Sequence, residues 1–117
     1  MDADQSWPPD LLRAVLDLCV LRIVEAGPTY GYAIAAALAD RGLGTVKGGT
    51  LYPLLKRFED AAWVRVEWRP GDGGPGRKYY ALTEAGQTAL ADRAATWQAF
   101  VPVVAAFMNP LTEEVPS

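Results

Sequence analysis

The sequence contains no histidine and only one cysteine, Cys19. A single cysteine excludes an intramolecular disulfide, and its position in an apolar run favours a buried thiol over a reactive one. Without histidine the usual ligand set of a zinc ion is missing. No catalytic constellation and no glycine-rich phosphate loop in the required context replaces it. We therefore expect no metal, no cofactor and no enzymatic activity.

The sequence also lacks a long uninterrupted apolar segment. The longest ones are broken by Asp17, Arg22 and Pro102, so none is suited to span a bilayer. Residues 1–4 are acidic, where a secretory signal would be basic. These features predict a cytoplasmic protein that does not associate with a membrane. Half of the 117 residues are hydrophobic, which predicts one folded domain, small enough to gain stability from a partner chain.

The net charge of -3 hides an uneven distribution along the chain. Residues 41–78 contain eight Lys or Arg and four Asp or Glu, whereas the rest contains three basic and ten acidic residues. A positive segment of this kind is suited to a polyanionic partner. The acidic remainder is expected to weaken sequence-independent binding to nucleic acid.

Apolar periodicity predicts three helices in the first half, at residues 11–25, at 30–39, and from Gly48 or Gly49 to about residue 62. The first is apolar on nearly every side, so we expect one side to meet another subunit. Pro8 and Pro9 can start this helix, and Gly27 followed by proline can end it. The second and third helices are predicted to form a helix-turn-helix.

The third helix is predicted to be amphipathic. Leu51, Leu54, Leu55 and Phe58 recur at i, i+3, i+4 and i+7, and these form one apolar stripe. Hydroxyls and cations lie off that stripe, as the major groove of DNA requires. Pro53 is expected to be tolerated because it lies near the helix start, where amides have no partner within the helix.

Two strands and one long helix are predicted to follow. Val64, Val66 and Trp68 alternate with charged residues, residues 78–82 form the return strand, and the Gly- and Pro-rich residues 70–76 should form a mobile, irregular hairpin tip. Such a hairpin after a helix-turn-helix is a wing. Thr83 should cap a helix from Glu84 to about Met108, with a kink at Pro102. The fold class expected is mostly α with a small β-hairpin: a winged helix-turn-helix followed by a C-terminal dimerisation helix.

Four motifs in this order resemble the PadR family of winged-helix transcriptional regulators. They are residues 12–18, 27–34, 49–53 and 77–86, and the similarity covers about residues 11–90. The single C-terminal helix resembles the short subgroup, in which the last helix packs with the first helix of the other subunit. One departure is Lys47-Gly48, where the family often has serine and proline. This change is expected to loosen the start of the third helix.

The resemblance implies a homodimer that binds a pseudo-palindromic site on double-stranded DNA, represses transcription and is released by a small-molecule effector. It divides the chain into a DNA-binding domain at 9–82, a dimerisation helix at 83–109 and a flexible tail at 110–117. The expected DNA contacts are Tyr32, Thr50, Tyr52, Lys56, Arg57, Arg77 and Lys78. The expected dimer interface consists of Leu12, Val15, Leu16, Cys19, Trp97, Val101, Val104 and Met108.

For three sets of residues the sequence allows a second role besides DNA contact or dimer interface. Lys56 and Arg57 could form a solvated helix face, and the tyrosines at 30 and 32 could pack around Gly31 or add a hydroxyl to a bound phosphate. Trp97 and Phe100 could be interface core, or could stack a flat aromatic or drug-like effector in a pore between subunits. The alternative function is thus a small-molecule-binding protein whose dimer pore is its main site. A protein-interaction module that no longer binds DNA is a third.

Overall fold

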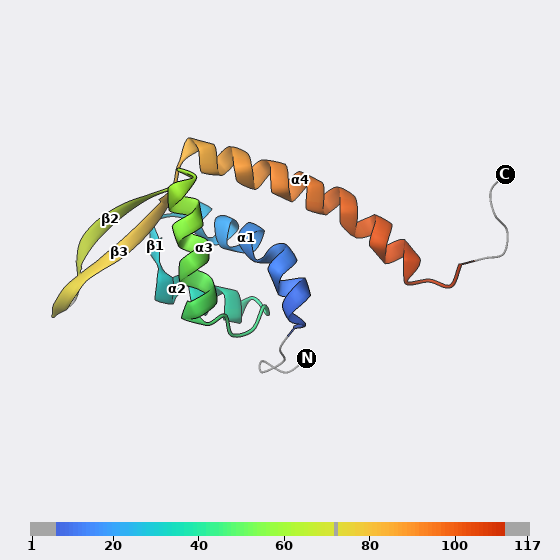
Figure 1. Cartoon of the computed structure of the whole chain (residues 1–117), viewed down its shortest axis with the longest axis horizontal. Helices are drawn as coiled ribbons and strands as arrows, with labels where there is room; N and C mark the ends of the chain where they lie inside the picture. Colours follow the sequence, from blue (N-terminus) through green and yellow to red (C-terminus); the bar gives the residue numbers. More distant parts are fainter. Residues whose placement is uncertain (1–6, 72, 112–117) are drawn as a thin grey trace.

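The computed structural model describes residues 7–71 and 73–111. Within them the elements are α1 (Pro9–Glu25), β1 (Thr29–Tyr30), α2 (Gly31–Asp40), α3 (Gly48–Asp60), β2 (Val64–Gly71), β3 (Gly74–Leu82) and α4 (Glu84–Phe107) (Figure 1). The expected fold class, mostly α with a small β-hairpin followed by one long helix, is confirmed. In this part of the chain no helix is long and apolar enough to cross a membrane.

The core lies where α1, α2 and α3 meet the sheet. The apolar stripe of α3 is buried there, and Phe58 and Leu55 are among the most deeply buried side chains. One face of α1 packs against this stripe, while α2 adds Ile34 and Leu38. Leu90 from α4 belongs to the same core, so the first turns of α4 stabilise the winged-helix unit itself.

α1 starts and ends as its sequence dictates. Pro9 is its first residue, a position where proline's fixed φ suits the helix and its missing amide removes no bond. The backbone turns away at Gly27, whose φ of +146° is accessible to glycine and strained for other residues. Both expectations for this helix are confirmed.

The three-stranded sheet has the order β1-β3-β2 and contains one strand that the sequence did not reveal. β1 is only two residues long, with Thr29 opposite Tyr80 and Tyr30 opposite Tyr79 in antiparallel register. A strand this short cannot show an alternating pattern. Its pairing fixes the start of α2 beside β3.

The wing strands extend further than predicted. Residues 70–76 were expected to be irregular, but β2 continues to Gly71, β3 starts at Gly74, and these two glycines lie opposite each other. At the irregularity between Arg69 and Gly71, the single residue Pro70 of β2 lies opposite two residues of β3, so the ladder is interrupted where proline has no amide to donate. Asp72 at the tip lies outside the described residues.

α4 is tied to the end of α3 at its first turn. The Thr83 hydroxyl accepts a hydrogen bond from the Gly86 amide at 3.0 Å and donates one to the Ala62 carbonyl at 2.6 Å, which confirms the predicted cap. A Cβ at Gly86 would overlap the Trp63 carbonyl oxygen. This close approach requires glycine and presses α4 against the turn before β2.

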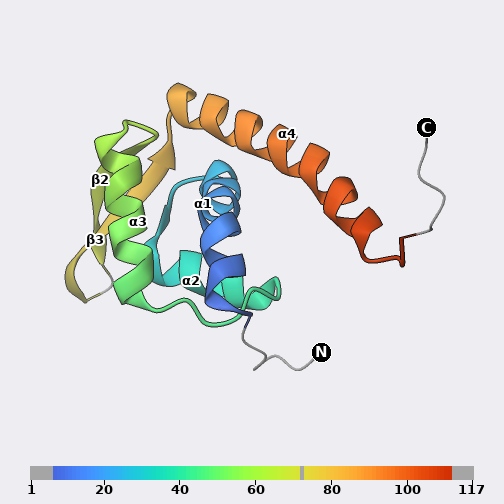
Figure 2. The same cartoon turned by 45° about the vertical axis from the view of Figure 1, so that its right-hand side comes forward.

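The second half of α4 leaves the rest of the chain. The helix continues through Pro102 to Phe107, and in two views its C-terminal end extends beyond the other elements (Figures 1 and 2). Phe100, Val103 and Phe107 are more than half exposed. Of the tail predicted at 110–117, only Pro110 and Leu111 lie within the described residues.

Pro53 lies further into α3 than expected, so the expected reason why the helix tolerates this proline is wrong. It is the sixth residue of α3, not one of the first four whose amides lack partners. The helix therefore forgoes the bond that this residue's amide would make to the Gly49 carbonyl.

Tyr52 holds α2 and α3 together through two glycines. A Cβ at Gly31 would lie 2.7 Å from ring carbons of Tyr52 and would overlap its hydroxyl. A Cβ at Gly48 would lie 3.3 Å from the same ring. Tyr52 thus occupies a slot between the starts of the two helices while remaining 53% exposed.

We predict that the effect of Gly31→Ala on the free energy of unfolding changes sign when Tyr52 is removed. In the wild type the added methyl displaces the exposed end of the Tyr52 side chain and lowers the free energy of unfolding by about 1 kcal/mol, the low end for overpacking. In a Tyr52→Ala background the space is free, so alanine at this helical position becomes neutral or stabilising by about 0.4–1 kcal/mol. Urea unfolding of the four proteins measures the coupling. Gly49→Ala, in open space, is the control and should not respond to Tyr52. Equal effects of Gly31→Ala in both backgrounds would rule out the slot.

Candidate nucleic-acid interface

The outward face of α3 forms one wall of a hollow of about 380 Å³, here called the wing-side recess. The start of α2 and strand β3 form its other walls. It brings together five of the seven predicted DNA contacts: Tyr32, Tyr52, Lys56, Arg77 and Lys78. Three of these are cations and two are tyrosines. The recess therefore offers positive charge and hydroxyls on one side of an exposed helix.

Acidic neighbours hold both lysines of the recess in place. Lys56 Nζ lies 3.0 Å from Asp60 Oδ1, and Lys78 Nζ lies 3.1 Å from Glu59 Oε1. The hydrogen bond to Asp60, together with the charge of that carboxylate, raises the pKa of Lys56, so this lysine is charged at neutral pH. Both ion pairs are solvent-accessible and thus weak. A phosphate could take the place of either carboxylate at small cost.

Aromatic rings support the arginines of the wing. The Arg77 guanidinium carbon lies 4.6 Å from the centre of the Tyr30 ring, and Arg69 lies 4.4 Å from that of Tyr79. Tyr30 in turn packs on Tyr79 at 5.3 Å between ring centroids. Burial raises the pKa of Tyr80, the buried residue of the pair at 79 and 80. Tyr30 therefore has a packing role, whereas Tyr32 is 77% exposed at the rim of the recess.

Thr50 and Arg57 lie on the other flank of α3. They line a separate groove of about 690 Å³ between α1 and α3, here called the α1–α3 groove. At about 100° per residue, Thr50 and Arg57 lie about 20° apart on the helix and Tyr52 and Lys56 about 40° apart, with the two pairs well separated. The residues predicted as one set therefore form two flanks.

Trp68 corrects the predicted strand pattern. Its alternation with Val64 and Val66 placed it on the buried face, but Trp68 is 69% exposed whereas Val64 is buried. The wing has extended beyond the core at that point, so alternation no longer reports burial. The alternation of apolar and charged residues does not reveal at which residue the wing extends beyond the core.

The residues predicted for the dimer interface lie on α1 and the outer half of α4. Val101 and Val104 are 40% and 41% exposed, and Met108 is 73% exposed, while Leu16 is buried in the chain's own core at 7%. An apolar groove of about 470 Å³ lies between the two helices, and its walls include Leu12, Val15, Trp97, Phe100, Val101 and Val104. Leu16 has little surface left for a partner. Burial, followed by the charge of Asp17, raises the pKa of the Cys19 thiol, which is therefore protonated at neutral pH.

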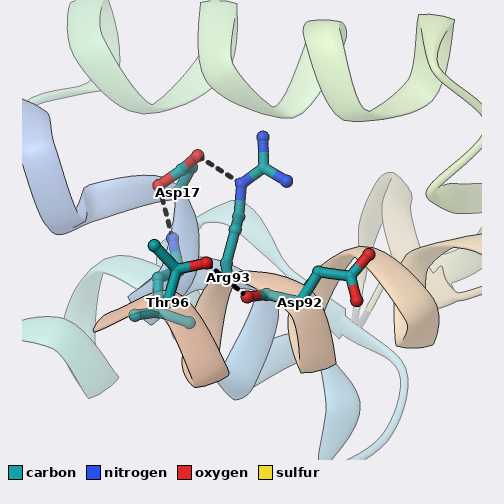
Figure 3. A network of polar contacts seen from close by, with 5 residues as sticks. Asp17, Asp92, Arg93 and Thr96 are labelled. Atoms are coloured by element: carbon teal, nitrogen blue, oxygen red, sulfur yellow. Dashed lines mark hydrogen bonds and ion pairs between the residues drawn. The ribbon is translucent and has the colours of Figure 1, made fainter. Parts of the chain in front are cut away.

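An ion pair that the sequence analysis missed joins α4 to α1. Arg93 Nε donates to Asp17 Oδ2 at 2.9 Å (Figure 3). The Arg93 guanidinium carbon lies 4.5 Å from the centre of the Trp63 ring. The Asp92 carboxylate points away from this ion pair in Figure 3. These contacts of Arg93 link α4 to α1 and to the turn after α3. Asp17 and Arg93 are 76 positions apart in the sequence, so no local pattern could have revealed this ion pair.

Known proteins share this arrangement and parts of the sequence. Residues 20–92, more than half of the chain, match the model of the transcriptional regulator PadR-like family. A PadR family transcriptional regulator from Eggerthella lenta is 33% identical, with a TM-score of 0.78 over 87% of this chain and 88% of that one. A PadR-like regulator from Bacillus cereus is 28% identical, with a TM-score of 0.78 over 87% and 99% of the two chains. An uncharacterised protein from Lysinibacillus sphaericus is 28% identical over 87% of this chain and 95% of its own.

The exposed helix with its basic recess, the wing and the long last helix agree with the match in sequence. The family consists of transcriptional regulators and not of enzymes. Its winged helix binds DNA. The chain belongs to the PadR-like family of transcriptional regulators.

Proposed function

We propose that the chain is a homodimeric repressor that binds a pseudo-palindromic site on double-stranded DNA and is released by a small-molecule effector. The wing-side recess carries this proposal, because it gathers Tyr52, Lys56 and Lys78 around the exposed face of α3. An α-helix of about 10–12 Å diameter fits a major groove of about 12 Å width. Such a protein would work in the cytoplasm, where the DNA is.

The recess offers two kinds of contact to DNA, one to base edges and one to backbone phosphates. Tyr52 projects from α3 and can reach base edges, whereas Lys56 on α3 and Arg77 and Lys78 on β3 can meet phosphates. Phosphate contacts set orientation and register, and contacts to base edges set the sequence preference. Two α3 helices related by a two-fold axis would enter successive major grooves about one helical turn apart.

A second copy of the chain is proposed to cover the outer half of α4. Phe100, Val103 and Phe107 are 54%, 56% and 63% exposed, and their spacing at i, i+3 and i+7 places them on one face of the helix. A contiguous apolar surface of this kind marks an association site. The apolar groove along α1 is continuous with it through Trp97.

The effector is proposed to bind beside Trp97, and the structure favours an uncharged flat aromatic molecule. Trp97 is 39% exposed, its ring lies 6.4 Å from that of Phe100, and both line the apolar groove. The hollow on the other side of Trp97 contains Arg22 and Arg41, and Asp17 nearby is bound to Arg93. The walls of the apolar groove itself are all apolar, which favours an uncharged ligand there. The alternative function, a ligand-binding protein whose dimer pore is its main site, rests on the same groove.

DNA binding predicts a defined response to salt. Duplex DNA from the intergenic region beside the gene should bind, with an affinity that falls as salt rises. Lys56→Ala with Lys78→Ala should weaken binding and reduce the slope of log K against log salt by about 0.9 per lost phosphate contact. Fluorescence anisotropy over a salt series measures both quantities. A slope unchanged by the double substitution would remove the lysines from the interface.

The dimer predicts a mass of about twice the chain's 12.6 kDa at low micromolar concentration. Val104→Asp places a charge in the proposed interface and should yield monomer, because an unpaired buried carboxylate is costly. Gln87→Asp, on the first half of the same helix, is the matched control. Light scattering distinguishes the two species. A folded wild-type monomer at these concentrations would refute the dimer.

Stacking against Trp97 predicts that planar uncharged dyes bind the wild type and bind Trp97→Ala at least several-fold more weakly. An indole contributes on the order of 1 kcal/mol beyond area burial. Calorimetry is the suitable measurement because four tryptophans make fluorescence ambiguous. The variant must first be shown to be dimeric. Equal affinity for the two proteins, or no binding to either, would assign Trp97 to the interface core alone.

A further inference from the structure

The α1–α3 groove is separate from the wing-side recess and from the hollows beside Trp97. Its volume is about 690 Å³. Arg13 stands on its α1 wall, Lys47 on the segment before α3, and Thr50 and Arg57 on α3. Three cations and a hydroxyl therefore face one groove on the flank of α3 opposite to the wing.

The charge of this groove is less neutralised than that of the wing-side recess. Within the described residues, no carboxylate lies within 4.0 Å of a charged nitrogen of Lys47 or Arg57, whereas Lys56 and Lys78 each have an acidic partner. Arg13 pairs with Asp10 in a contact that is largely exposed on both sides, and such pairs are weak.

The one acidic residue that lines the groove is held elsewhere. Asp17 binds Arg93 across the joint between α1 and α4 (Figure 3). Its charge is compensated by that guanidinium before any ligand arrives. The groove therefore presents a net positive potential toward solvent from Lys47 and Arg57.

We propose that the α1–α3 groove contacts the second phosphate strand of the duplex, so that α3 is held between two backbones. This inference rests on the proposed DNA binding. A helix that fills the major groove has one sugar-phosphate strand along each flank. The wing-side recess can meet only one of them, and Lys47 and Arg57 face the other. Arg57, which has a planar guanidinium, can bind a phosphate in a bidentate manner.

The test compares two pairs of substitutions on the same DNA. Lys47→Ala with Arg57→Ala should reduce the slope of log K against log salt by about two units, as for two lost phosphate contacts. Between 50 and 200 mM salt the wild type should then lose about 10-fold more affinity than this variant. The loss should be similar for specific and unrelated duplexes, since phosphates carry no sequence information.

The controls separate this inference from the proposed function. Arg41→Ala removes one cation beside the Trp97 hollow and should leave the slope unchanged, whereas Arg57→Lys should retain most of it and exclude misfolding as the cause. An unchanged slope for Lys47→Ala with Arg57→Ala, while Lys56→Ala with Lys78→Ala lowers it, overturns the inference and leaves DNA binding intact. If the wild type binds no duplex at any salt concentration, both fail.

Discussion

The burial of the apolar stripe of α3 determines how every other part of this molecule can act. Leu51, Leu54, Leu55 and Phe58 are each at most 3% exposed, and burying a side chain of this size stabilises the fold by about 1.5–3 kcal/mol. A rotation of α3 by one residue would expose part of this surface. The rotation of the helix is therefore fixed, and with it the direction of Tyr52 and Lys56 on one flank and of Arg57 on the other.

The long helix is coupled to the winged-helix unit at three places. The Thr83 hydroxyl bonds to the end of α3, Gly86 lies against the Trp63 carbonyl, and Arg93 binds both Asp17 and the Trp63 ring. Because these contacts leave α4 little freedom relative to α3, a change in how the two α4 helices of the proposed dimer cross would alter the separation of its two α3 helices. The proposed effector beside Trp97 would therefore need no direct contact with the proposed DNA-binding residues.

Local sequence signals were sufficient for the parts of the fold that depend on local physics. The helices, the proline start of α1 and the cap at Thr83 follow from spacing and residue type. Two-residue β1, the full length of the wing and the exposure of Trp68 depend on where the chain meets or leaves the core, which a local pattern does not encode. The Asp17–Arg93 pair depends on tertiary contact across the chain.

The sequence predicted which residues belong to the candidate site, but the structure divides them between two separate surfaces. Five of the predicted residues meet in one recess, while Thr50 and Arg57 lie in a different groove. The sequence shows that all of them avoid the apolar stripe of α3. It does not show that their flanks are separated, because that depends on the walls that α1, α2 and β3 supply. The slot that Tyr52 fills likewise depends on Gly31, a residue of another helix.

The entry of α3 into the major groove can be measured with a tethered cleavage reagent. Gly49→Cys in a Cys19→Ser background places one thiol on the exposed start of α3, where a side chain meets open space. An iron chelate attached there should cut both strands within the bound site, in two clusters about one helical turn apart, with the offset that marks the major groove. Cleavage in the minor groove, or none within a protected site, would contradict the account.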